Sequence, residues 1–150
     1  MEKNRKLFLG ENGKLILGKR KKIILGIIAA VLLVGLAFGV KYYRDFEYYQ
    51  KAMSALTIEN IDPKDIKDGT YTGSFDARVI SAVTRVTVKD GKITNIELLE
   101  HKNGRGKPAE AIVDKILEEQ SLDVDAVSGA TNSSKTILKA VENALNNGAV

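Results

Sequence analysis

The chain has 150 residues, no cysteine, a single histidine and a formal net charge of +4. The lack of cysteine excludes disulfides, thiolate metal sites and iron–sulfur clusters, and a single histidine leaves no His-based metal site. Redox or group-transfer chemistry would therefore require an organic cofactor, and no metal is expected.

The positive charge is concentrated at the N-terminal end. Residues 1–22 carry eight Lys/Arg and two Asp/Glu, whereas the remaining residues carry 15 Lys/Arg and 17 Asp/Glu. Proteins that bind nucleic acid present positive charge on a folded face, where it neutralises phosphates. Because the part of this chain expected to fold is mildly acidic, we expect no nucleic-acid partner.

An apolar segment follows this basic leader. Residues 23–40 contain no charged side chain, and as a helix they would span about 27 Å, close to the hydrocarbon thickness of a bilayer. The segment is flanked by Lys19-Arg20-Lys21-Lys22 and by Lys41-Tyr42-Tyr43, a pattern typical of a membrane helix. We predict a transmembrane helix over 23–40, with residues 1–22 in the cytoplasm and the following domain outside. A cleaved signal peptide, with Ala37-Phe38-Gly39 as a weak site, is the alternative.

Residues 41–67 are predicted to form a stalk and linker. The part from Tyr42 to Leu56 has no helix breaker and would continue the membrane helix. Its larger side chains recur at a spacing of three and four residues and so share one face of that helix: Tyr42, Phe46, Tyr49 and Met53. Packing against the domain or the membrane interface is favoured for this face over a quinone contact. Residues 58–67, which include Pro63, are expected to be a linker.

The folded domain is predicted over residues 68–147. Apolar alternation indicates strands over 70–75, over 77–89, and over 92–100. Asp90-Gly91 between the last two strands is a strong signal for a two-residue hairpin turn. Two helices are expected to follow, over 108–119 and 132–145. The predicted fold class is α+β, a small antiparallel sheet with two helices, preceded by one N-terminal transmembrane helix.

The segment between the two predicted helices carries the most informative motif, Asp125-Ala126-Val127-Ser128-Gly129-Ala130-Thr131-Asn132-Ser133-Ser134. It resembles the acceptor site of the FMN-binding domain family, which has an Asp, two variable residues, Ser or Thr, and then Gly-Ala-Thr. Further blocks occur in the family's order: residues 68–73, 86–93, His101 and Gln120-Ser121. The chain is also similar to the flavin-carrying subunits of Na+-translocating NADH:quinone reductase and Rnf-type complexes. Its short loop after His101 looks more like the small single-domain members.

The resemblance implies that a flavin transferase joins FMN through its phosphate to Thr131. Glycine allows a sharp turn, and the first turn of a helix offers free N–H groups to a phosphate. The other residues expected to bind the cofactor are Ser128, Gly129, Ala130, Asn132, Ser133, Ser134, His101, Gly104 and Asp125. Two roles stay open for His101, a contact with the isoalloxazine ring or a packing or surface position. Asp125 is either an ordinary turn residue or part of the surface that the transferase recognises.

These expectations lead to one functional hypothesis and one alternative. The hypothesis is a membrane-anchored, extracytoplasmic FMN protein that relays electrons from a membrane quinone or NADH dehydrogenase to an external acceptor. A separate FAD-dependent FMN transferase would attach the flavin. A redox carrier is favoured over a stand-alone enzyme. The alternative is a membrane-anchored flavin-binding module that senses or scaffolds without passing electrons.

Overall fold

The computed structural model describes residues 16–149, so most of the basic leader lies outside the described residues. The chain divides into two compact units, residues 1–43 and residues 44–150. The second unit contains every strand that the structure describes and both helices predicted to follow the sheet. It also contains the motif at 125–134.

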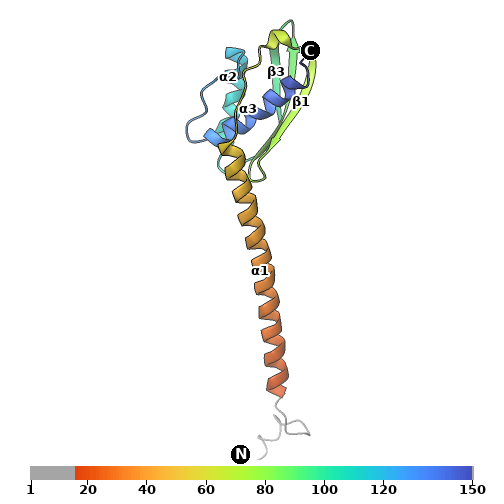
Figure 1. Ribbon diagram of the computed structural model, residues 1–150, viewed down its shortest axis with the longest axis vertical. Coiled ribbons are helices and arrows are strands. Elements are labelled where there is room, and N and C mark those ends of the chain that lie inside the picture. Colours follow the sequence, from red (N-terminus) through yellow and green to blue (C-terminus); the bar gives the residue numbers. More distant parts are fainter. Residues whose placement is uncertain (1–15, 150) are drawn as a thin grey trace, which may run out of the picture. The chain divides into compact units, whose positions relative to one another are not determined.

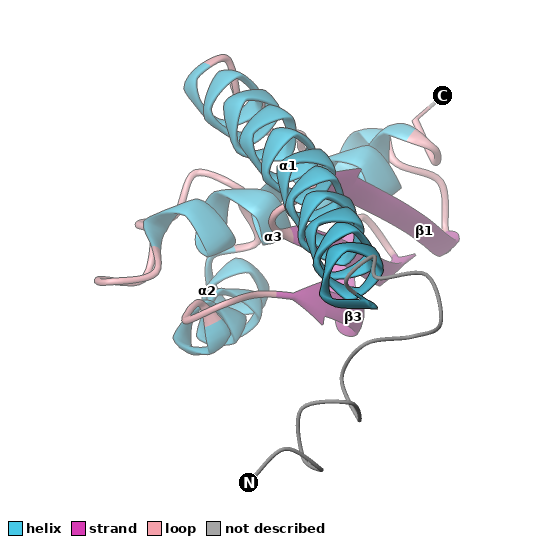
Figure 2. Cartoon of the chain, turned by 90° about the horizontal axis from the view of Figure 1, so that it is seen from below, coloured by secondary structure: helices cyan, strands magenta, loops and turns pink. Residues whose placement is uncertain are grey.

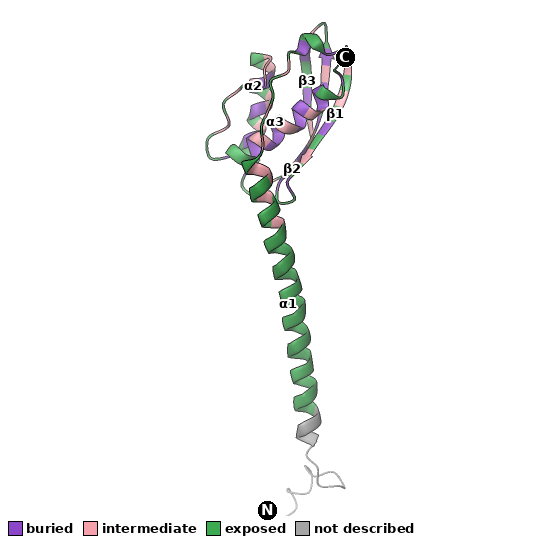
Figure 3. Cartoon of the chain, in the orientation of Figure 1, coloured by how far each residue is buried: buried purple, intermediate pink, exposed green. Residues whose placement is uncertain are grey.

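Helix α1 (Ile16–Ser54) is the first described element. Its most apolar stretch has a mean hydropathy of 2.9 and no buried residue, as the exposed colouring in Figure 3 indicates. By length and composition this helix could cross a membrane. The helix continues without interruption beyond residue 40, as the absence of a helix breaker predicts.

Three antiparallel strands form the sheet in the order β1 (Gly69–Asp76), β2 (Ser81–Lys89) and β3 (Lys92–Lys102). Asp90 and Gly91 have φ of 53° and 70°, and these positive values are those of the predicted hairpin turn. The strand predicted from residue 77 begins instead at Ser81. The cause is a turn at 77–80, in which the Asp76 carboxylate accepts the Arg78 backbone N–H at 2.6 Å.

The helices cover one face of this sheet. Helix α3 (Thr131–Asn146) packs on β1 and β2, and α2 (Ile112–Glu119) packs beside it on β3. A short 3-10 turn, η3 (Lys107–Ala111), leads into α2 and is part of the helix predicted over 108–119. The two layers can be followed in Figure 1, where α3 is blue, and in Figure 2, where the strands are magenta. The fold is therefore α+β, as the alternation and helix patterns predict.

Close contact between α3 and β1 depends on a glycine. A Cβ atom built on Gly73 would lie 2.2 Å from the backbone N of Ala144 and 2.3 Å from the backbone O of Ala140. Real atoms do not approach so closely, so only glycine fits where the helix backbone crosses the strand. This contact sets the distance between α3 and the sheet, and with it the position of the N-terminal end of α3.

Two irregularities in β3 change which side chains face the helices. Its register with β2 shifts at Thr94 and again at Leu99, so that Thr84 pairs with Leu98 while Val83 pairs with Glu100. Each extra residue is a β-bulge, which reverses the alternation of the residues that follow. After the second bulge His101, rather than Glu100, turns toward the helical layer, where its side chain is 3% exposed.

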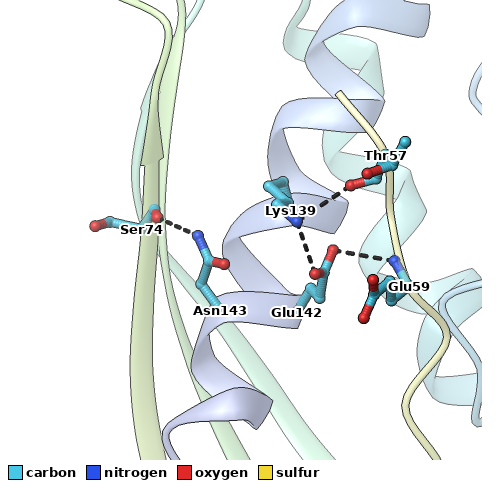
Figure 4. Close-up of polar contacts among 6 residues, drawn as sticks. All are labelled: Thr57, Glu59, Ser74, Lys139, Glu142 and Asn143. Atoms are coloured by element: carbon cyan, nitrogen blue, oxygen red, sulfur yellow. Dashed lines mark hydrogen bonds and ion pairs between the residues drawn. The ribbon is translucent and has the colours of Figure 1, made fainter. Parts of the chain in front are cut away.

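The segment expected to be a linker, residues 58–67, packs on the domain. Ile66 is buried and forms an antiparallel bridge with Ala149. Figure 4 shows how the preceding residues are held to α3: Lys139 Nζ donates to the backbone O of Thr57 at 3.1 Å, and the Glu142 carboxylate accepts from Glu59 N at 3.3 Å. Lys139 Nζ also lies 2.7 Å from Glu142 Oε1, so the buried carboxylate of Glu142 is paired with a positive charge.

Candidate functional site

The N-terminal end of α3 is the centre of the predicted site. Gly129 has φ +77°, a left-handed conformation that suits glycine, and the helix begins two residues later at Thr131. The N-cap residue is Ala130, which offers no side chain to cap the helix. The backbone N–H groups of the first turn, at Thr131, Asn132 and Ser133, are therefore available to an external acceptor.

A glycine loop lies directly against this helix end. A Cβ atom on Gly106 would meet Ser133 Oγ at 1.9 Å, so the loop backbone approaches the first turn of α3 as only glycine permits. Gly104, in the same loop, has no neighbour within 4 Å of its Cβ position. The loop therefore packs tightly against α3 at Gly106, whereas the space around Gly104 is free.

The loop and the helix end line a common cleft of about 490 Å³, within the range of small-molecule sites. Six residues predicted from the sequence line it: Gly104, Gly129, Ala130, Thr131, Asn132 and Ser133. Thr131 is exposed, so its hydroxyl is accessible from the cleft. Most of the predicted cofactor-binding residues are therefore brought to one place.

Five further residues that line the cleft did not follow from the motif: Tyr49, Val79, Ile80, Arg105 and Gly106. Arg105 brings a guanidinium group that has no ion-pair partner within the described part of the chain. Tyr49 comes from the last turns of α1, and its hydroxyl accepts a hydrogen bond from Asn132 Nδ2 at 2.6 Å. The sequence signal for Tyr49 is its place on the aromatic face of α1.

His101 does not line the cleft. Its Nδ1 lies 3.1 Å from Glu110 Oε1 and 3.2 Å from Asn103 Nδ2, while Nε2 is buried and has no hydrogen-bond partner among the described residues. Asn103 Nδ2 also donates to the backbone O of His101 at 3.1 Å. Through its contacts with Asn103 and Glu110, His101 therefore connects the start of the glycine loop to η3.

The remaining predicted residues lie outside the cleft lining. Ser134 is fully buried, and its hydroxyl accepts the backbone N–H of Val127 at 3.0 Å, which ties the turn to the helix. Ser128 is exposed. Asp125 borders two neighbouring hollows, one of them lined mainly by acidic side chains, and its backbone O accepts from Lys115 Nζ at 2.9 Å. These three residues shape the turn or its outer surface.

The residues of the cleft suit FMN at both of its ends. A phosphate requires hydrogen-bond donors and positive charge, which the first-turn N–H groups, the helix dipole and Arg105 provide. The isoalloxazine ring requires an apolar or aromatic surface, which Tyr49, Val79 and Ile80 provide.

Comparison with known proteins agrees with this geometry. Residues 81–146 match the model of the family described as FMN-binding domain. An uncharacterized protein of Treponema pallidum (strain Nichols) is 34% identical over 86 residues, which are 55% of this chain and 24% of that protein. This chain thus spans about a quarter of the length of that relative. The chain carries a domain of the FMN-binding family, and FMN is the cofactor of that domain.

Proposed function

We propose that this chain is a membrane-anchored flavoprotein whose FMN is joined covalently to Thr131 and relays electrons on the outer side of the cytoplasmic membrane. The observation that carries the proposal is the position of Thr131, the exposed first residue of α3 in a cleft with free backbone donors. The family match supports FMN as the cofactor. The apolar helix α1 supports the membrane anchor.

The attachment is a phosphoryl transfer that a separate FMN transferase would catalyse with FAD as the donor. The Thr131 hydroxyl oxygen forms a bond to the flavin-side phosphorus of FAD, the bond from that phosphorus to the AMP portion breaks, and AMP leaves. The hydroxyl proton is released to the transferase or to water. The reaction requires a hydroxyl that a second protein can reach, and Thr131 is exposed at the beginning of a helix.

The chain's own groups would hold the phosphate after attachment. Each N–H of the first helical turn can donate to a phosphate oxygen, and the α3 dipole stabilises the negative charge by roughly 0.3–1 kcal/mol, or about 2 kcal/mol if partly buried. Arg105, which also lines the cleft, adds a full positive charge. Bound FMN supplies a ring that accepts and donates electrons.

An electron relay suits a flavin held in this way. A flavin that dissociated outside the cytoplasm would be lost by diffusion, and a phosphoester prevents that loss. The electron donor in the proposal is a membrane quinone pool or NADH dehydrogenase, and the acceptor is external. The orientation is supported by the charges, since Lys19-Arg20-Lys21-Lys22 precedes the apolar stretch and cytoplasmic flanks carry such clusters.

Attachment is tested by substituting the acceptor hydroxyl. The full chain is expressed with an FMN transferase and examined for flavin fluorescence in a denaturing gel. The native chain and Thr131→Ser should be fluorescent and Thr131→Ala dark, while Ser128→Ala, which removes an exposed hydroxyl three residues away, should remain fluorescent. The native chain should gain about 438 Da, the mass of FMN less water. A bare mass for the native chain in the presence of the transferase would refute covalent attachment.

The electron-relay part needs a separate measurement. Membranes that contain the flavinylated chain are mixed with a quinol, and the flavin absorbance is followed before and after an external acceptor is added. We expect bleaching by the quinol and recovery with the acceptor, and neither with the Thr131→Ala chain. Failure of the flavin to be reduced by a quinol or by NADH in such membranes would favour the sensor or scaffold instead.

A further inference from the structure

Helix α1 brings an aromatic side chain into the cofactor cleft from outside the family domain. Tyr49 lies 32 residues before the first residue of the segment that matches the FMN-binding family, which is Ser81. Val79 and Ile80, which share the apolar side of the cleft, also precede that segment. This wall of the cleft is therefore built by residues of the chain that the family match does not include.

The contacts of Tyr49 hold its ring in place. Its hydroxyl accepts a hydrogen bond of 2.6 Å from Asn132 Nδ2, on the residue that follows the proposed attachment point. Its ring lies 6.1 Å from the ring of Phe46, one turn earlier on α1. A side chain fixed at both its hydroxyl and its ring loses little further freedom when a ligand packs against it.

Arg78 holds the end of α1 beside the turn that carries Val79. Its guanidinium donates to Asp45 Oδ1 at 3.1 Å and lies 4.3 Å from the centre of the Tyr48 ring. Its backbone has φ 66°, and its backbone O accepts a hydrogen bond from Lys102 Nζ. These contacts join the last turns of α1 to the end of the sheet, so the two parts of the apolar wall keep a common position.

We infer that Tyr49 packs against the isoalloxazine ring and that the membrane-proximal helix thereby forms one side of the flavin site. The inference rests on the proposed attachment at Thr131. With the phosphate held by the backbone N–H groups at the start of α3, the ring has the apolar residues of the cleft lining within its reach. The apolar side is lined by Tyr49, Val79 and Ile80, and Tyr49 is the one aromatic residue in the lining. Aromatic rings pack favourably against other flat rings, in offset or edge-to-face contacts.

The inference predicts how the native flavin responds to changes at Tyr49. The full chain, flavinylated and solubilised in detergent, is compared in native and denatured form, because denaturation separates the ring from the protein in every variant. An electron-rich phenol in contact with a flavin quenches its emission. The ratio of native to denatured emission should therefore rise several-fold in Tyr49→Ala, and quenching of native emission by iodide should increase as the ring becomes accessible.

Two further variants define the contact. Tyr49→Phe keeps the ring and loses only the bond to Asn132, so iodide accessibility should stay near that of the native chain while emission rises. Tyr43→Ala removes an exposed tyrosine that does not line the cleft, and both readings should be unchanged. A Tyr49→Ala chain with native emission and native iodide accessibility would overturn the inference. Absence of flavin from the denatured native chain would instead refute attachment, so the two failures are distinct.

Discussion

The hydroxyl side chains around the motif differ in burial, and burial separates their roles. Ser134 is fully buried and accepts a backbone hydrogen bond, so it serves the fold. Ser133 is 6% exposed and lies against Gly106. Ser128 is exposed but lies outside the cleft lining. Thr131 alone among these four is both exposed and in the cleft, as the proposed attachment requires.

His101 illustrates a residue that its surroundings assign to the fold. We expect His101→Ala to leave flavin attached to Thr131, because His101 does not line the cleft. The substitution removes a side chain that is 3% exposed and bonded to Glu110, so the free energy of unfolding should fall by roughly 1–3 kcal/mol. Denaturant unfolding of the flavinylated chain measures the change. Loss of flavin from a chain that still folds would instead assign His101 to the cofactor site.

At the scale of elements, the sequence predicts the parts of the fold that repeat regularly. Alternation located β1, the Asp90-Gly91 pair located the hairpin, and the apolar stripe from Ile137 to Leu145 located α3. Simple alternation fails in β3, because each bulge inserts one residue and reverses the phase. Nothing in the local sequence marks either bulge, so alternation counted from Ile93 would turn Ile96 and Leu98 outward. The second bulge restores the phase, and His101 faces the same side as Ile93.

The sequence predicts only the part of the candidate site that is contiguous in the chain. The motif at 125–134 is contiguous, so its position at the start of a helix could be derived from turn and helix signals. Tyr49 and Arg105 meet Thr131 in the cleft only through tertiary packing; the aromatic face of α1 is visible in the sequence, but not the surface that it contacts. Val79 and Ile80 were predicted to lie within a strand that begins at residue 77, so their place in the cleft was missed. The turn at Arg78, with its left-handed backbone, interrupts this otherwise alternating segment.

The crossing of α3 over β1 yields a prediction about stability. Gly73→Ala should lower the free energy of unfolding by about 1–3 kcal/mol, because the new methyl group would collide with the backbone of α3 and force the layers apart. Gly104→Ala is the matched control, since its Cβ would have no neighbour within 4 Å, and its stability should be close to native. Urea unfolding of both variants is the measurement. Equal stabilities would mean that α3 can move away from β1 at little cost.

At the scale of the whole molecule, the topology of the chain in the membrane decides which of the proposed electron donors and acceptors could reach the domain. Protease added to intact cells stripped of their wall should digest residues beyond the membrane helix and spare the basic leader. The reason is the cluster Lys19-Arg20-Lys21-Lys22, which favours a cytoplasmic N-terminus. A tag at each end, detected after digestion, reports which side is protected. Protection of the C-terminal tag until the cells are lysed would reverse the orientation.

The bridge between Ile66 and Ala149 has a consequence for how this domain can be arranged in proteins. With Lys67 N donating to Gly148 O at 3.3 Å, the domain begins and finishes at the same corner. A unit with adjacent ends can be inserted into a host loop as a cassette, or repeated in tandem, without stretching its own chain. Each copy would carry its own equivalent of Thr131, the proposed acceptor, but not of Tyr49, which precedes the bridge and would have to be supplied by the host chain. The similarity to one quarter of a longer Treponema protein suits such a cassette.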